Sequence, residues 1–463
     1  MRPYTRWWLV FLLWPIFLLA QEPLVLTVDQ SVDLALKHNP ELRIAEEQLS
    51  KARAGIGEAI ATLLPSVTGR ASLQHAWEIQ KTTVPNFIKQ AMRLPDGTYV
   101  LPGVEFMPDY LQIAFGIENQ FYYGVSLTQP LFLGGAGWAG VKIARSAKIA
   151  AEQNLHAKKQ EVIYNTVNAF YACLLAKEVI SVQEQAVEQA KANLDLVRKK
   201  YENGTASGFD KMRAEVDLAN LQPQLISAQN AYQSALTRLR MVMGISETTP
   251  IVPEGKLEFV EDPLDTLSLS EIQQIAKMRR PEFRALKAQE SMASGGLMVA
   301  RSQFLPKVIF QTDYSFLAMR RDYKFTEEDF SKGFTSSIGL QIPLFTGFNR
   351  LYSYHKARMD YKIVKDSQKQ LSDGVAAETE MAFHKFHEAR EKYRSAKESI
   401  SMAEEALRLA NLMYEEGAST QLDVMGARLA LTQARLNYAN ALYEYQMARY
   451  GLRKAMGILD RVL

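Results

Sequence analysis

Four short segments of the chain alternate apolar and polar residues. These segments cover about 66–77, 120–128, 307–316 and 334–342. A period of two over about ten residues predicts β-strands with one apolar and one polar face. About ten residues is also the length that a tilted strand needs to cross a bilayer. Aromatic residues near the strand ends, such as Trp77, Tyr123 and Phe316, suit the membrane interface. The edge of a soluble β-sandwich is the alternative, and four strands alone are too few for a transmembrane barrel.

Two stretches without proline predict very long helices. They begin after Pro130 and after Pro343, and they are 92 and 120 residues long. Proline costs about 3 kcal/mol inside a helix, so its absence permits long helices, and both stretches are rich in strong helix formers. Apolar residues recur there at alternating steps of three and four, over 218–239 and 431–452. This spacing indicates coiled-coil seams, which we interpret as packing surfaces rather than binding sites.

Each long stretch is interrupted once by a compact turn. The two turns cover 201–210 (YENGTASGFD) and 414–423 (YEEGASTQLD). Gly204 and Gly417 suit the left-handed position just past a helix end, and Ser207 and Thr420 are good N-caps for the next helix. Each half of the chain is therefore predicted to hold an antiparallel helical hairpin. The longer arms, over about 137–203 and 348–416, would each measure roughly 100 Å at 1.5 Å per residue.

The chain is a tandem duplication. The two turns lie 213 positions apart, and the same offset relates Pro130-Leu131-Phe132 to Pro343-Leu344-Phe345. Upstream, an offset of 241 relates Leu64-Pro65 to Leu305-Pro306. The difference of 28 residues lies between Pro65 and Pro130. The extra segment is rich in proline and contains an Asp-Gly pair, a composition that predicts a loop insertion rather than a new helix.

The predicted organisation has four parts. A signal peptide at 1–20 precedes a first repeat at 21–243, a segment at 244–270 and a second repeat at 271–457. The first repeat is expected to hold a short helix, a β-hairpin at 65–130 and a helical hairpin at 137–243. The second is expected to hold a short helix, a β-hairpin at 306–343 and a helical hairpin at 348–457. The expected joints between strands and helices are Pro65, Pro130, Pro306 and Pro343.

The N-terminus predicts export. An apolar run of fourteen residues, Trp7–Ala20, follows two arginines, and this arrangement is typical of a secretory signal peptide. The run is short for a membrane-spanning helix, although an uncleaved anchor or a buried N-terminal helix remains the alternative. No apolar run of eighteen residues follows residue 20. A protein of this kind could still span a membrane as a β-barrel, because that architecture satisfies every backbone group.

Composition removes several function classes. Lys and Arg total 54 and Asp and Glu total 51, so the formal net charge of +3 does not suit a nucleic-acid-binding protein. At 47% hydrophobic residues the chain is too apolar to be disordered. The single cysteine, Cys173, excludes an intramolecular disulfide framework and a multi-cysteine metal site, and it is expected to be a small packing residue.

Two other candidate sites are weak. His384 and His387 lie at helical spacing from Glu380 and Glu388, as a metal site requires. The helix is highly charged, so a solvated face is favoured over a metal site. Residues 134–137 (GGAG) precede a helix but lack the Lys-Ser/Thr of a phosphate loop. No Ser-His-Asp arrangement stands out. We therefore expect no enzyme activity, no metal and no cofactor.

Together these features resemble the outer-membrane efflux protein family, the TolC-like channels. The resemblance covers about 24–457 and rests on the duplicated order of helix, proline, two strands, Pro-Leu-Phe and long helix, and on the two Tyr-Glu-X-Gly-X-X-Ser/Thr-X-X-Asp turns. It implies an α+β membrane protein in which a long antiparallel α-helical coiled-coil barrel continues into a transmembrane β-barrel. A homotrimer would supply twelve strands, four from each chain, and residues 244–270 would pack around the equator of the helical tunnel.

The resemblance also implies a function. The trimer would be the exit duct of a tripartite efflux or type I secretion system, set in outer-membrane lipid with a periplasmic helical tunnel. It would work with a periplasmic adaptor protein and an inner-membrane pump, and it would bind no nucleic acid. The alternative is a periplasmic coiled-coil adaptor or structural protein, which predicts one hairpin beside a lipoyl-like domain rather than a duplicated hairpin with paired strands. Drugs, metal ions and polypeptides all remain possible cargo.

Residue roles follow from the same resemblance. The turns would form the periplasmic tip, where the adaptor docks on Tyr201, Gly204, Thr205, Ser207, Tyr414, Gly417, Ala418 and Thr420. Asp210 and Asp423 would line the constriction. The chain departs from the family pattern because Gly426 replaces a second acid and Ser419 replaces a basic residue. The alternative role for both aspartates is to complement the dipole at the start of a helix.

Overall fold

The computed structural model describes residues 24–114 and 116–460, so the predicted signal peptide at 1–20 lies outside the described residues. The chain forms two compact units. The helical unit comprises residues 24–51, 149–289 and 364–460, and the strand unit comprises 52–148 and 290–363, without residue 115. Among the described residues, none of the helices combines the length and the hydropathy that a membrane-spanning helix requires.

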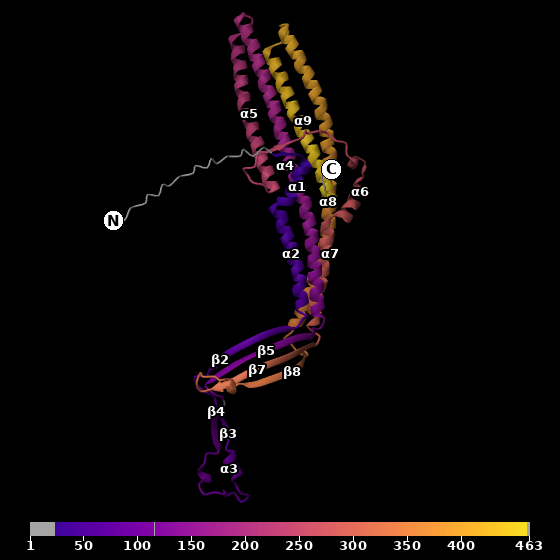
Figure 1. The fold of residues 1–463 in the computed structure, drawn as a ribbon. Coiled ribbons are helices and arrows are strands. Elements are labelled where there is room, and N and C mark those ends of the chain that lie inside the picture. Colours follow the sequence, from indigo (N-terminus) through magenta and orange to yellow (C-terminus); the bar gives the residue numbers. More distant parts are fainter. Residues whose placement is uncertain (1–23, 115, 461–463) are drawn as a thin grey trace, which may run out of the picture. The chain divides into compact units, whose positions relative to one another are not determined.

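The strand unit contains a four-stranded antiparallel sheet in the order β2-β5-β7-β8 (Figure 1). The strands are β2 (Ser66–His75), β5 (Asn119–Phe132), β7 (Lys307–Arg320) and β8 (Ser331–Gln341). One hairpin comes from each half of the chain, and β5 pairs with β7 where the halves meet. Within the described residues β2 and β8 are the edges of an open sheet.

Three of the four predicted proline joints lie between a helix and a strand. Pro65 separates α2 (Pro40–Ala61) from β2, Pro306 separates α7 (Pro281–Ser302) from β7, and Pro343 separates β8 from α8 (Asn349–Glu415).

The placement of Pro130 at a joint is wrong, because β5 continues through it to Phe132. The sheet register shifts between Pro130 and Phe132, and such a bulge accommodates a residue that has no N–H to donate. The turn into α4 (Ala136–Glu202) comes later, where Gly134 and Gly135 have φ of 63° and 86°.

The insertion in the first repeat is more ordered than its composition predicts. It forms a two-stranded sheet from β3 (Lys81–Pro85) and β4 (Tyr110–Ala114), a helix of one turn, α3 (Phe87–Ala91), and a 3-10 turn at Val104–Phe106. The expectation of a loop without a helix is therefore wrong. The reason is local: the Asn86 side chain accepts a hydrogen bond from the Lys89 N–H and so caps α3.

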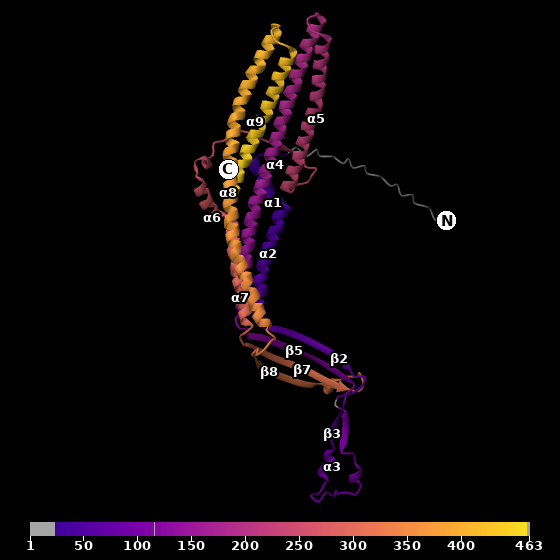
Figure 2. The same cartoon turned by 180° about the vertical axis from the view of Figure 1, so that it is seen from behind.

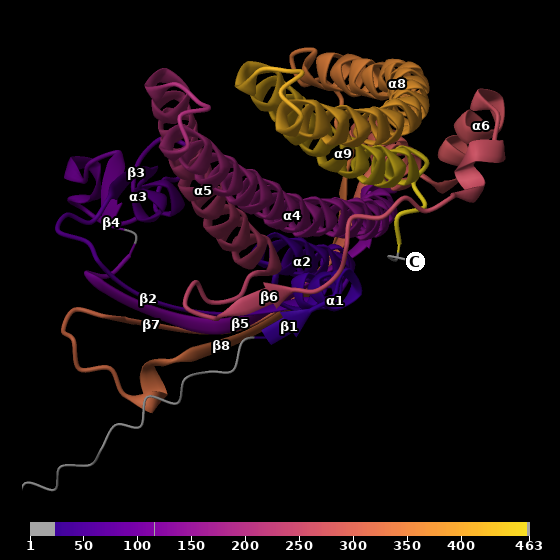
Figure 3. The ribbon, with the colours of Figure 1, turned by 90° about the horizontal axis from the view of Figure 1, so that it is seen from above.

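The helical unit repeats its elements in the two halves of the chain. Short helices α1 (Val28–His38) and α2 precede the first hairpin, and α6 (Leu269–Arg279) and α7 precede the second. The hairpins are α4 with α5 (Gly208–Met243) and α8 with α9 (Gln421–Ala455), seen as two pairs of helices in Figures 2 and 3. Strands β1 (Leu24–Leu26) and β6 (Ile251–Pro253) form a small parallel sheet. Helices α4 and α8 are each 67 residues long.

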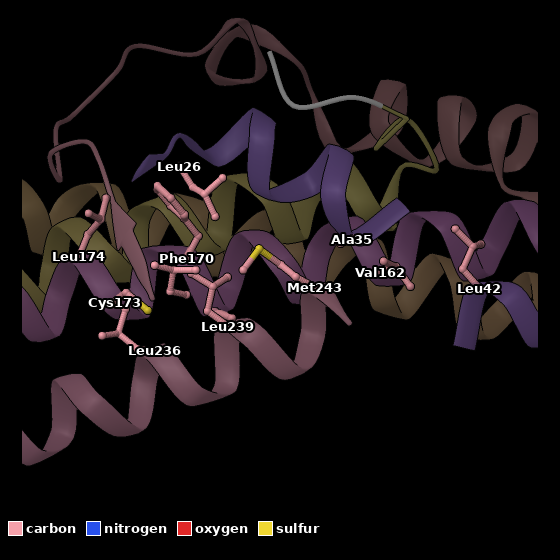
Figure 4. Close-up of a cluster of buried hydrophobic side chains, with 12 residues drawn as sticks. Leu26, Ala35, Leu42, Val162, Phe170, Cys173, Leu174, Leu236, Leu239 and Met243 are labelled. Atoms are coloured by element: carbon pink, nitrogen blue, oxygen red, sulfur yellow. The ribbon is translucent and has the colours of Figure 1, made fainter. Parts of the chain in front are cut away.

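The largest apolar core joins α1, α2, α4, α5, β1 and β6 (Figure 4). Cys173 is fully buried there, near Phe170, Leu236 and Leu239. Burial raises the pKa of the Cys173 thiol to about 12, so the side chain stays a neutral thiol at ordinary pH. The prediction that Cys173 is a packing residue is confirmed.

The segment after β6 is fastened to α9 by a buried ionic cluster. Asp262, whose side chain is only 1% exposed, accepts hydrogen bonds from Arg449 Nε at 2.5 Å and from Arg453 Nη2 at 2.7 Å. The Tyr445 hydroxyl donates to the Val260 carbonyl at 2.8 Å, and Phe259 stacks on Tyr393 with ring centres 4.4 Å apart. Buried charge is tolerated here because the carboxylate is paired with two guanidinium groups.

Each hairpin ends in a glycine that touches the junction of the preceding short helices. Gly244 follows α5 with φ 68°, and a Cβ there would lie 2.4 Å from the His38 carbonyl oxygen. Gly457 follows α9 with φ 71°, and a Cβ there would lie 2.8 Å from the Arg280 nitrogen. Only glycine combines the left-handed conformation with such a close approach.

We expect Gly244→Ala to destabilise the protein more than Gly204→Ala does. Both residues have positive φ, but no atom lies within 4 Å of a Cβ built at Gly204. The control, Gly204→Ala, should therefore lower the free energy of unfolding only by the strain of the left-handed conformation, about 1–2 kcal/mol. Gly244→Ala should add a steric term of about 1–3 kcal/mol. Urea unfolding followed by circular dichroism measures the difference, and equal midpoints for the two variants would contradict the close approach.

Candidate functional site: the tips of the two helical hairpins

The two predicted turns have the same backbone construction. At the end of α4 the Thr205 N–H donates to the Lys200 carbonyl at 2.8 Å, and at the end of α8 the Ala418 N–H donates to the Met413 carbonyl at 2.7 Å. Gly204 and Gly417 adopt φ of 72° and 75°. This pattern is typical of a glycine-terminated helix end. The repeated glycine is therefore explained by the geometry of the turn.

Capping boxes start the returning helices. Asp210 Oδ2 accepts a hydrogen bond from the Ser207 hydroxyl at 2.6 Å, and the Asp210 N–H donates to Ser207 Oγ at 3.1 Å. Asp423 Oδ2 accepts from the Thr420 hydroxyl at 2.6 Å and from the Thr420 N–H at 2.8 Å. These hydrogen bonds lower the pKa of the Asp423 carboxyl. Within one chain both aspartates thus perform the local role at a helix start.

One lysine joins the two turns. Lys200 Nζ donates to the Tyr414 carbonyl oxygen at 2.9 Å and lies 3.9 Å from the centre of the Tyr414 ring. Burial raises the pKa of the Tyr414 hydroxyl, with a smaller contribution from the charge of Asp210. Tyr201, the matching residue of the first turn, is exposed and has Lys211 5.5 Å from its ring centre. The two hairpins are therefore linked asymmetrically at their ends.

A buried ion pair lies further from the turns. Arg428 on α9 pairs with Asp217 on α5, although Arg428 is only 5% exposed. Its Nη1 has no hydrogen-bond partner among the described residues, and burial lowers the pKa of its guanidinium. Gln421, which lies within the second turn, is 4% exposed, and both polar atoms of its side chain also lack a partner in the described part of the chain. Arg435 adds a contact to Glu404 at 3.0 Å and another to Gln185.

The structure brings the predicted turn residues together as two clusters, one at the end of each hairpin. The turn residues Thr205 and Ala418 are exposed, and so are both glycines. Sequence reasoning missed Lys200, Arg428 and Asp217. Arg428 did leave a signal, because it extends the seam of α9 upstream at the spacing of Val424, Arg428 and Leu431, and a charge at a seam position requires a partner.

His384 and His387 of α8 differ in their exposure. The described residues contain no group of three or more His, Cys, Asp or Glu side chains that could hold a metal ion. His384 is exposed, as a solvated face predicts. His387 differs, because its ring packs on Phe383 with centres 4.4 Å apart and its Nε2 is buried without a partner among the described residues. The expectation of a solvated face is therefore wrong for His387.

The sequences of several relatives align with most of this chain. Alkaline protease secretion protein AprF of Pseudomonas aeruginosa is 22% identical over 454 residues, which is 96% of this chain and 87% of AprF. Protein CyaE of Bordetella pertussis is 25% identical over 72% of this chain, but the match spans only 63% of CyaE. Outer membrane protein TolC of Vibrio cholerae is 20% identical over 73% of this chain and 76% of TolC.

Solved structures share the fold. The outer-membrane channel OprN superposes with a TM-score of 0.74 over 93% of this chain and 89% of OprN, at 20% identity. The CmeC outer membrane channel of Campylobacter jejuni gives 0.75 over 93% of this chain and 85% of CmeC, at 21% identity. The family model described as "Outer membrane efflux protein" matches residues 31–245 and 272–458. The resemblance predicted from the sequence is confirmed: the chain belongs to the outer membrane efflux protein family and has an outer-membrane transport role.

Proposed function

We propose that three copies of this chain form the exit duct of a tripartite efflux or type I secretion system. The duct conducts substrates passively from a periplasmic adaptor and an inner-membrane pump to the outside. The observation that carries the proposal is the open sheet, because within the described residues no strand pairs with the outer edges of β2 and β8. In a bilayer each unpaired group costs several kcal/mol, so membrane-spanning sheets close into barrels. One chain has too few strands to close.

Strand direction supports closure by copies of the same chain. Along β2-β5-β7-β8 every neighbour is antiparallel, so β2 and β8 run in opposite directions. The β8 edge of one chain can therefore pair with the β2 edge of the next and keep the alternation. Three chains give twelve strands, within the size range of transmembrane barrels. The helical hairpins of three chains would likewise close a coiled-coil tunnel.

Exposed apolar side chains on the edge strands suit a lipid-facing surface. On β8 they are Phe334, Ile338 and Leu340, which are 70%, 69% and 62% exposed and share one face because their positions differ by even numbers. On the neighbouring strands Tyr123 stacks on Phe316 with ring centres 4.6 Å apart. Aromatic rings near strand ends are typical of the interface between hydrocarbon and water. These residues support outer-membrane lipid as the surroundings of the sheet.

The names of relatives differ in cargo. AprF is named for the secretion of alkaline protease, CzcC of Cupriavidus metallidurans for cobalt, zinc and cadmium resistance, and OpmQ of Pseudomonas putida for pyoverdine export. The proposed duct function therefore does not depend on any one class of cargo. The periplasmic adaptor loses its support as an alternative, because the family matched in both halves is that of the outer-membrane proteins.

The proposed adaptor-docking surface is the pair of turns. Its residues are Tyr201, Gly204, Thr205, Ser207, Tyr414, Gly417, Ala418 and Thr420. Among the described residues, apart from the two chain neighbours of each glycine, no atom lies within 4 Å of a Cβ built at Gly204 or Gly417, so side chains of an adaptor could approach the backbone there. Asp210 and Asp423 would line the constriction, where copies from three chains form acidic rings. The Arg428–Asp217 pair would hold the two hairpins of each chain together in the closed tip.

Membrane fractionation tests the duct proposal directly. We expect the protein in the outer membrane as a trimer that dissociates to monomers only when the detergent sample is heated. The trimeric barrel would resist detergent because its strands pair around a closed ring. A monomer found only in the soluble periplasm would contradict the proposal.

We expect Arg428→Met to increase single-channel conductance in a planar bilayer. The substitution keeps a long unbranched side chain but removes the guanidinium group that pairs with Asp217, so the hairpins lose a link in the closed tip. The matched control is Arg408→Met, because Arg408 pairs with Glu405 at 2.7 Å on the exposed surface, where solvent screens an ion pair and leaves it little effect. If both variants conduct like the unsubstituted trimer, the Arg428–Asp217 pair has no role in the gate.

We expect Asp423→Ala to reduce cation selectivity, because it removes the carboxylate of the proposed acidic ring. Thr420→Ala serves as the control, since it weakens the same helix cap but retains the carboxylate. The hydrogen bonds from Thr420 lower the pKa of Asp423. The variant Thr420→Ala should therefore lose selectivity at a higher pH than the unsubstituted channel does as the pH falls. Unchanged conductance and selectivity in Asp423→Ala would exclude the acidic ring and leave only the helix-start role.

A further inference from the structure

The insertion between β2 and β5 holds a definite shape of its own. Asn86 is 2% exposed, and its amide donates to the Pro108 carbonyl at 2.9 Å. Lys89 Nζ donates to the Met107 carbonyl at 2.6 Å and pairs with Asp109 at 2.8 Å. In the second repeat only residues 321–330 connect β7 to β8. The insertion is thus a structured addition that occurs once per chain.

The apolar residues of this insertion mostly face outward. Val104 is the one large apolar side chain that is buried among its described residues, at 4% exposure. Within residues 81–114 six others are more than half exposed, and we call them the apolar set: Phe87, Ile88, Val100, Leu101, Phe106 and Tyr110. Phe106 reaches 87%. Exposed apolar surface on an ordered segment marks an interaction surface.

Charge distinguishes between possible partners. Residues 81–114 carry Lys81, Lys89 and Arg93 against Asp96, Glu105 and Asp109, so their formal net charge is zero. A segment that binds an anionic lipid surface normally combines apolar side chains with an excess of Lys and Arg. This segment has no such excess. A neutral segment can instead approach copies of itself without electrostatic repulsion.

We propose that the three insertions of one trimer pack against one another through their apolar sets and form a cap over the outer end of the duct. This inference rests on the proposed trimeric duct. The insertion leaves the sheet where His75 of β2 pairs with Asn119 of β5, so a closed ring of strands places all three insertions at the same rim. The partner of each insertion is therefore a second copy of this chain.

Because the barrel tethers the three copies, a small contact area between their insertions is sufficient for the insertions to associate. The six side chains include three aromatic residues, which bury roughly 150–250 Å² each when covered. The contact per copy is thus on the order of 500 Å², too little for a stable complex between free proteins. The barrel, however, holds the copies together at an effective concentration in the millimolar range. Strands β3 and β4 also each have a free edge that could pair with a neighbouring copy.

Two cysteine variants of the full-length trimer test the cap. In a single chain Phe106 and Thr98 are both exposed, whereas Cys173 is buried and serves as an unreactive background. In the trimer, we expect the Phe106→Cys thiol to be largely protected from labelling by a bulky membrane-impermeant maleimide. We also expect Phe106→Cys to form disulfide-linked dimers within the trimer under mild oxidation. Thr98→Cys, at an exposed position outside the apolar set, should be labelled fully.

Each outcome bears on the proposal. Full labelling of Phe106→Cys in a folded, conducting trimer would overturn the cap but leave the duct intact. Protection without cross-linking would also overturn it, because lipid or another molecule would then cover the apolar set. A cross-linked, protected Phe106→Cys supports the cap, as does a higher conductance when a short Gly-Ser linker replaces 81–114. If neither variant nor the unsubstituted chain forms a trimer, the duct fails and the cap fails with it.

Discussion

In the described part of the chain, the outer edges of β2 and β8 have backbone N–H and C=O groups that no other strand pairs. These unpaired groups determine how the rest of the molecule can work. In the proposed duct, lipid offers no partner for these groups, so the sheet would close on neighbouring copies. Once the ring is closed, the apolar side chains of β8 can face lipid and need no core within their own chain. Every element attached to the sheet is then repeated around one axis. In the proposed duct, long helices that enclose little within one chain become the wall of a tunnel.

A comparison of the two repeats shows which contacts both of them make and which contacts occur only once. Gly244 and Gly457 make equivalent close approaches to the junctions α1–α2 and α6–α7, so both halves fasten their hairpins in the same way. Among the described residues, the Asp262 cluster and the insertion each occur once, without a counterpart in the other repeat. The first fixes the segment between the repeats to α9, and the second adds apolar surface to one connection of the sheet. Differences between the halves therefore lie in connections, while the packed elements keep their order.

Local signals predict the helix ends well. Helices expected over about 137–203 and 348–416 are observed at Ala136–Glu202 and Asn349–Glu415, because a glycine at positive φ stops each helix within a few residues. Local sequence signals fail where an irregular backbone feature or a contact with a distant residue determines the structure. Pro130 fits inside β5 because a bulge absorbs it. Lys200 contacts Tyr414, and Arg428 contacts Asp217, across more than 200 positions of sequence. Helical periodicity identifies a face but cannot name the residue opposite it.

The Arg428–Asp217 pair is better explained by specificity than by strength. Apolar residues of similar volume at such a position typically give equal stability or more, by about 1–4 kcal/mol, because a buried ion pair loses its hydration. An apolar seam, however, tolerates many registers, whereas a buried guanidinium needs its carboxylate in one place. Arg428 also keeps Nη1 without a partner in the described residues, so the pair is incompletely satisfied in this arrangement. A contact that specifies one position while adding little net stability is suited to the tip of the proposed duct, which would both close and open.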